Sequence, residues 1–130
     1  MISLDLAHRL RASGVPWTAS AGDRFVVPER EMDDQVFVVS DMVVEVHELP
    51  SGPLLKFNGT TEWALDSIQQ HEVVWLPRED QLRELLGESF RALEATPGGF
   101  VVRVDRKGRE ERHTDIDAEC ALARAVLAGA

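Results

Sequence analysis

The residues best suited to acid–base or metal chemistry are two carboxylates and a nearby histidine. Glu62 and Asp66 lie four residues apart, so on a helix their side chains share one face, and His71 follows soon after. Two carboxylates placed in this way can serve as a general acid and a general base, or can bind a metal ion. The solvated face of an ordinary helix shows the same spacing, and it is the simpler interpretation.

A second histidine lies in a stretch that favours a β-strand. His47 and Glu45 are two residues apart and therefore point to the same side of a strand, and Asp41 lies further back in the sequence. Zinc sites need three or four convergent ligands, and the sequence contains neither a His-x-x-x-His nor a Cys-x-x-Cys pair. We therefore predict no metal site and no cofactor, because the outer face of a half-buried sheet already explains this alternation.

Motifs for nucleophilic or phosphate chemistry are absent from the sequence. Cys120 is the one cysteine, and the neighbouring Asp117 and Glu119 disfavour a reactive thiolate, so we expect it to pack as a small apolar side chain. The sequence has no Gly-Lys-Ser or Gly-Lys-Thr phosphate loop and no Gly-x-Ser-x-Gly elbow. It thus predicts no catalytic residue and favours a protein that is not an enzyme.

A candidate contact surface for a partner or a ligand surrounds a tryptophan that follows a predicted strand. Backbone amides, an amide side chain and hydroxyl groups in this loop could hold a small polar group or the end of a peptide. The residues of this surface are Asn58, Thr60, Thr61, Glu62, Trp63 and Asp66. The alternative is that Asn58 and its neighbours only make the turn between a strand and a helix.

Composition points to one soluble domain over residues 1–130. The chain has 14 basic and 23 acidic residues, a net charge of −9, and 44% hydrophobic residues, which is enough for one core. The negative charge repels phosphate backbones and argues against nucleic-acid partners. The single cysteine and the lack of a long apolar segment indicate a cytoplasmic protein that does not insert into a membrane.

The first half of the chain is expected to form a helix and then short strands. Ser3 can cap a helix over residues 4–13. Residues 36–39 and 42–47 are rich in β-branched side chains and are expected to be neighbouring antiparallel strands. Further expected elements are strands at 24–27 and 54–57 and an acidic loop at 29–34.

The middle of the chain is expected to return to helical structure. A short helix after Thr60 or Thr61 turns Ile68 toward the core. A strand at 73–76 follows, and Trp75 within it is expected to pack in the core because apolar residues surround it in the sequence.

The last part of the chain is expected to hold two helices and a hairpin. A helix that begins at Pro77 turns three leucines inward, namely Leu82, Leu85 and Leu86. Residues 89–95 and 100–104 suit a hairpin, although 89–95 could equally continue a helix, and Thr114 resembles the cap of a last helix. Together the elements predict an α+β fold, with a mainly antiparallel sheet of about five to seven strands and three or four flanking helices.

Four stretches of the sequence carry a resemblance to known proteins. They are residues 22–28, 36–42, 57–66 and 75–82. Together they resemble a group of small uncharacterised actinobacterial proteins, some of which carry an automatic pilus-assembly label. The resemblance covers most of the chain and implies a bacterial, cytoplasmic origin.

Two hypotheses for the function follow from these observations. The favoured one is a non-enzymatic adaptor or regulatory module that binds another protein, because an acidic domain without a catalytic motif would act through its surface. The alternative is a small-molecule-binding protein or hydrolase that uses Glu62, Asp66 and either His71 or His47. A homodimer is compatible with both hypotheses.

Trp63→Ala tests whether the surface around Trp63 binds a partner. On the predicted helix Trp63 lies at the edge of the apolar stripe, so we expect the variant to keep most of its stability and to lose affinity for a captured partner. Chemical denaturation measures the first effect. A loss of roughly 3–5 kcal/mol, the cost of removing a buried tryptophan, would show instead that Trp63 is a packing residue.

Overall fold

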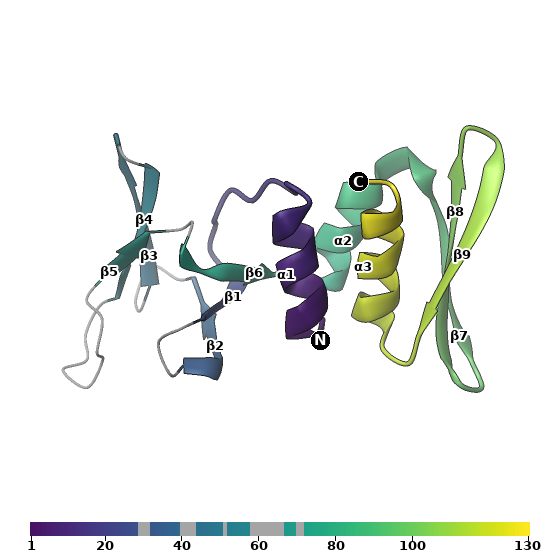
Figure 1. Cartoon of the computed structure of the whole chain (residues 1–130), viewed down its shortest axis with the longest axis horizontal. Helices are drawn as coiled ribbons and strands as arrows, with labels where there is room; N and C mark the ends of the chain where they lie inside the picture. Colours follow the sequence, from purple (N-terminus) through teal and green to yellow (C-terminus); the bar gives the residue numbers. More distant parts are fainter. Residues whose placement is uncertain (29–31, 40–43, 51, 58–66, 70–71) are drawn as a thin grey trace. The chain divides into compact units, whose positions relative to one another are not determined.

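The computed structural model describes residues 1–28, 32–39, 44–50, 52–57, 67–69 and 72–130 (Figure 1). These residues form two compact units. Unit 1 consists of Met1–Pro16 and Pro77–Ala130, and unit 2 consists of Trp17–Leu76. The fold is α+β with antiparallel sheets, as the sequence predicts. A single domain over residues 1–130 stays a prediction.

Unit 1 combines three helices with one sheet. Its elements are α1 (Leu4–Ala12), α2 (Glu79–Leu86), the short 3-10 helix η2 (Gly87–Ser89), β7 (Phe90–Thr96), β8 (Gly99–Arg106), β9 (Arg109–Asp115) and α3 (Ala118–Ala128). The strands form an antiparallel sheet in the order β7-β8-β9. Of the two alternatives left open for residues 89–95, the hairpin is the one observed, because residues 90–96 form strand β7. Strand β9 has no counterpart among the elements expected from the sequence.

One face of the unit 1 sheet carries α3, which also packs against α1 and α2 (Figure 1). Val102 and Val104 are fully buried. On the same face of β8, Arg106 Nη2 donates a hydrogen bond to the Ala125 carbonyl of α3, at 2.5 Å. Val102, Val104 and Arg106, at alternate positions of β8, therefore point toward the helices.

The helices of unit 1 begin at polar caps. Ser3 Oγ accepts the Leu6 N–H at 3.2 Å, so the predicted cap of α1 is confirmed. The predicted cap of the last helix is wrong, because Thr114 lies in β9 and Asp117 caps α3 by accepting the Cys120 N–H at 2.9 Å. Pairing with β8 holds Thr114 extended, opposite Val101.

The buried stripe of α2 is narrower than the sequence indicates. Leu82 and Leu86 are buried, whereas the predicted burial of Leu85 is wrong because its side chain is exposed. The start of α2 is held by Gln81, whose side-chain oxygen accepts the Arg78 N–H at 2.9 Å. This bond from the backbone N–H of the cap residue to the side chain three residues later is one of the two bonds of a capping box.

A single carboxylate joins the beginnings of the three helices. Glu119, in the first turn of α3, accepts the Ile2 N–H just before α1 on Oε1 and the N–H of Glu79, the first residue of α2, on Oε2, both at 3.1 Å. Helix N-termini have backbone donors without partners inside the helix, and a negative charge there is favourable.

Unit 2 contains two further three-stranded sheets among the described residues. Its elements are β1 (Arg24–Val27), β2 (Met32–Val38), β3 (Val44–Leu49), β4 (Gly52–Phe57), β5 (Ser67–Gln69) and β6 (Val74–Leu76). The strand orders are β2-β1-β6 and β3-β4-β5, with antiparallel pairing throughout. Buried side chains of the first sheet and its surroundings form a core of Phe25, Val27, Phe37, Val39 and Val73.

Three sequence-based expectations for unit 2 are corrected. The strands expected at 36–39 and 42–47 lie in different sheets, because β2 pairs with β1 and β3 pairs with β4. Residues 32–34 of the expected acidic loop belong to a strand, since β2 begins at Met32, and residues 29–31 lie outside the described residues. Ile68, expected on a helix, belongs to β5 and pairs with Leu55, and residues 58–66 before it lie outside the described residues.

Glu119→Ala is expected to lower the free energy of unfolding by about 2 kcal/mol, because two partly buried N–H groups lose a charged acceptor. Urea denaturation followed by circular dichroism measures the change. The matched control is Glu84→Ala, which removes an exposed carboxylate on α2 and should cost less than about 0.5 kcal/mol. Equal losses in the two variants would contradict a special role for Glu119.

Candidate functional site

The predicted contact surface lies outside the described residues. This holds for all of its members, Asn58, Thr60, Thr61, Glu62, Trp63 and Asp66. His71 also lies outside them, and although the backbones of Glu45 and His47 belong to β3, their side chains are not described. The contact surface and the carboxylate–histidine site therefore stay predictions.

A buried carboxylate organises the beginning of unit 2. Asp23 is 1% exposed, and its Oδ2 accepts hydrogen bonds from Trp17 Nε1 at 2.8 Å and from the Ser20 N–H at 3.0 Å. The Asp23 carbonyl accepts the Val39 N–H at 2.8 Å. Trp75 stacks on Trp17, with ring centroids 5.9 Å apart and an interplanar angle of 1°. These contacts fix residues 17–23 against β1 and β6, which is a structural role.

Strand β2 of unit 2 presents apolar side chains to solvent. Val36 and Val38 are 38% and 48% exposed, whereas Phe37 and Val39 between and after them are buried. This alternation follows from the period of two in a strand. β2 is an edge strand of its sheet in the described part of the chain, and Val36 and Val38 form an exposed apolar row on one face of this strand. We call these two residues the β2 row.

Unit 1 holds a cluster of charged side chains that the sequence analysis missed. Glu111 Oε1 accepts a hydrogen bond from Arg106 Nη1 at 2.6 Å and lies 3.0 Å from His113 Nε2. The hydrogen bond with His113 is the largest effect on the pKa of Glu111, and together with the charge of Arg106 it outweighs burial and lowers this pKa. Glu111 therefore stays ionised and orients the imidazole of His113.

The signal for this cluster was present in the sequence. Glu111 and His113 lie two apart, as Glu45 and His47 do, and side chains at this spacing share one side of a strand. The spacing has this meaning only on a strand, and β9 was not predicted. A carboxylate beside a histidine can support general base chemistry, provided that a reacting group lies within reach.

Arg106 connects this cluster to the end of α3. Besides Glu111, its guanidinium binds the Ala125 carbonyl, one of the last carbonyls of the helix, where a positive charge is favourable. Gly129 makes room for it, since a Cβ at this position would lie 2.7 Å from Arg106 Cζ. The position of the guanidinium thus requires a residue without a side chain at 129.

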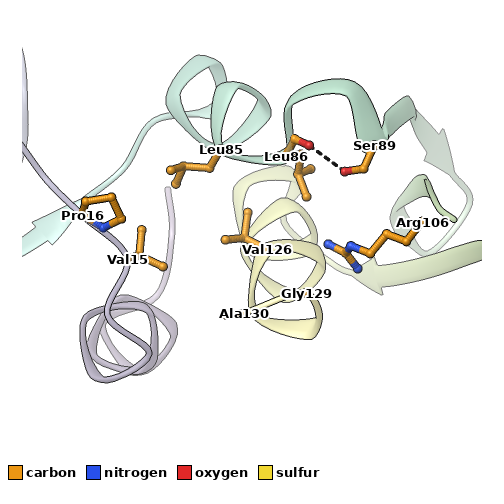
Figure 2. A pocket seen from close by; sticks show the side chains of 9 residues that line it. All are labelled: Val15, Pro16, Leu85, Leu86, Ser89, Arg106, Val126, Gly129 and Ala130. Carbon is orange, nitrogen blue, oxygen red and sulfur yellow. Dashed lines mark hydrogen bonds between the residues drawn. The ribbon is translucent and has the colours of Figure 1, made fainter.

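The same guanidinium borders a cavity of about 250 Å³ within unit 1 (Figure 2). Most of the residues that line it have apolar side chains or none, namely Val15, Pro16, Leu85, Leu86, Val126, Gly129 and Ala130. Its polar members are Ser89, whose hydroxyl donates to the Leu86 carbonyl at 2.6 Å, and Arg106. Both polar side chains already bind protein atoms.

Cys120 packs inside unit 1, as the sequence predicts. Its side chain is buried, and burial is the main cause that raises the pKa of its thiol, with a further contribution from Asp117. A raised pKa keeps the thiol protonated and unreactive at neutral pH. In the described part of the chain, no three His, Cys, Asp or Glu side chains gather into a possible metal site.

Comparison with known proteins places the chain in no described group. No protein family, no curated protein and no solved structure matches it. Among the described residues, no helix is long and apolar enough to cross a membrane.

Gly129→Ala tests whether Arg106 fastens the end of α3. The added Cβ displaces the guanidinium, so we expect a loss of about 1–2 kcal/mol in the free energy of unfolding, measured by urea denaturation. The matched control is Gly98→Ala, where a Cβ meets no atom within 4 Å and the expected change is below about 0.5 kcal/mol. An unchanged Gly129→Ala variant would mean that the contacts of Arg106 contribute little.

Proposed function

We propose that this chain is a non-enzymatic protein-binding module that recognises its partner through unit 2. The supporting observation is the distribution of charge between the units. Residues 17–76 contain 11 acidic and 3 basic residues, whereas the rest of the chain contains 12 acidic and 11 basic residues. The net charges are therefore −8 and −1, with histidine neutral. Such segregated charge steers association with a partner of opposite charge.

The β2 row adds an apolar contact to this charge. Val36 and Val38 are exposed on an edge strand, and the acidic residues Glu31, Asp33 and Asp34 precede them directly in the sequence. Protein interfaces commonly combine an apolar centre with a polar rim. The partner is accordingly a protein whose surface carries basic side chains around an apolar patch. The surface predicted around Trp63 falls within residues 17–76 and is part of this proposal.

The proposal also includes a cytoplasmic location, and it disfavours nucleic acid as a partner. A cytoplasmic location is supported by the single cysteine, which suits a reducing compartment. Nucleic acid is disfavoured because its phosphates would meet the same negative charge of unit 2. A bacterial origin is implied by the sequence resemblance.

Affinity capture at two salt concentrations tests this proposal. The immobilised chain is incubated with lysate of its native cells at about 50 mM and about 500 mM NaCl, since screening weakens contacts between exposed charges. We expect a basic protein, identified by mass spectrometry, to be retained at low salt and released at high salt. With the purified partner, the double variant Val36→Ser/Val38→Ser should bind at least about tenfold more weakly.

The matched control for the β2 row is Ile116→Ser. Ile116 lies in unit 1 and is 83% exposed, so the substitution removes a comparable exposed side chain without touching unit 2. We expect Ile116→Ser to bind the partner as tightly as the wild type does. If the double variant binds as well as the wild type, or if retention does not depend on salt, unit 2 is not the recognition surface.

A further inference from the structure

The sheet formed by β2, β1 and β6 has an open side at β2. β1 lies in the middle of this sheet, and in the described part of the chain no strand lies beyond β2. Val39, directly after β2, donates its N–H to the Asp23 carbonyl and accepts the Gly22 N–H, both at 2.8 Å. The backbone groups of Val39 therefore point toward the β1 side of the sheet.

Backbone groups alternate between the two sides of an antiparallel strand. Since Val39 turns toward β1, Phe37 does so as well, opposite Phe25. Val36 and Val38 consequently turn their N–H and C=O groups away from β1, to the open side. We call these outward groups of Val36 and Val38 the β2 edge. Groups of this kind on an edge strand can pair with another strand.

The β2 edge is short. The pairing with β1 is regular at Phe37 and Val38. Toward the start of β2 the register shifts, so that Met32 lies opposite Val27. An irregularity of this kind bends a strand and hinders addition of another strand there. The part of β2 that suits an added strand therefore begins at Val36, and a short segment is enough to cover it.

The charge of this strand favours a basic occupant. Asp33 and Asp34 belong to β2, and Asp34 is two residues from Val36, at most about 7 Å along an extended chain. That distance is shorter than the range of about 8–10 Å over which physiological salt screens a charge. A second copy of the chain would bring the same acidic strand and a net charge of −9, which disfavours it as the occupant.

We propose that the partner supplies a short extended segment that pairs antiparallel with the β2 edge as a further strand of this sheet, with basic residues on both sides of its apolar ones. This inference rests on the proposed function and adds the chemistry of the contact. Backbone hydrogen bonds to Val36 and Val38 give affinity, and alternate side chains of the added strand lie beside the β2 row. The flanking lysine or arginine residues complement Asp33 and Asp34.

A pair of peptides tests this pairing. The probe is acetyl-Lys-Lys-Val-Thr-Val-Lys-Lys-amide, and the matched control carries N-methyl groups on its Val-Thr-Val segment. Both peptides have the same charge and the same side chains, but the control lacks the N–H donors that an added strand needs. We expect calorimetry at about 50 mM NaCl to give the probe a Kd below about 1 mM and the control at least about tenfold weaker binding.

Val38→Pro tests the same contact from the side of the protein. Proline removes the outward N–H of residue 38, and an edge strand tolerates it where that group faces away from the sheet. We expect the probe to bind this variant at least about tenfold more weakly. The matched control, Val38→Thr, keeps the N–H and the branched shape, so it should bind within about threefold of the wild type. Urea denaturation checks that both variants fold.

Hydrogen exchange locates the contact. The probe should protect the amides of Val36 and Val38, and the N-methylated peptide should not. Equal binding of the two peptides would overturn strand pairing and leave the proposed function, recognition by charge, in place. Binding that neither high salt nor Val36→Ser/Val38→Ser weakens would overturn the proposed function and this inference with it.

Three other outcomes would also overturn the inference. The first is a probe that does not bind, and the second is protection confined to other segments. The third is protection of Val36 and Val38 that rises with protein concentration when no peptide is present, because a second copy of the chain would then occupy the β2 edge.

Discussion

The carboxylate of Glu119 is the contact on which the arrangement of unit 1 depends. It accepts backbone N–H groups from Ile2 and Glu79, residues that are far apart in the sequence and lie at the beginnings of two different helices. A hydrophobic face alone would let helices slide or rotate, because apolar contact is not directional. Hydrogen bonds to one charged group fix where the helices begin. The buried valines of β8 can then pack under α3 in one defined position.

Local signals in the sequence predicted the elements that are stabilised locally. The helix after Ser3 and the turn before β8 were visible because caps, turns and apolar periods are properties of short segments, whereas the same local signals left residues 89–95 open between strand and helix. β9 was not predicted because it has no apolar residue, and the contacts that keep it extended are tertiary, namely the pairing with β8, the packing against α3 and the ion pairs of Glu111 and Asp115. Strand partners could not be predicted either, since Ile68 joins its sheet through a ladder that no local period reveals.

The candidate sites also differ in whether a local sequence signal or only the tertiary fold reveals them. The exposed row of Val36 and Val38 follows from simple alternation along a strand and could have been predicted once the strand was recognised. The contacts of Arg106 could not have been predicted, because Ala125, whose carbonyl it binds, and Gly129, which makes room for it, lie at the end of a helix that only the tertiary fold brings near. The unequal distribution of charge could be calculated only once the boundaries of the two units were known, although the sequence already shows every acidic and basic residue.

The order of the units along the chain has a consequence for biosynthesis. Unit 2 is one continuous stretch, whereas unit 1 is made of the two ends of the sequence. A ribosome adds roughly 5–20 residues per second, so α1 emerges several seconds before the segment that carries Glu119. During this interval the apolar face of α1, with Leu6 and Leu10, has no partner from its own unit. The nascent chain therefore exposes a short hydrophobic segment that chaperones can bind until α3 is complete.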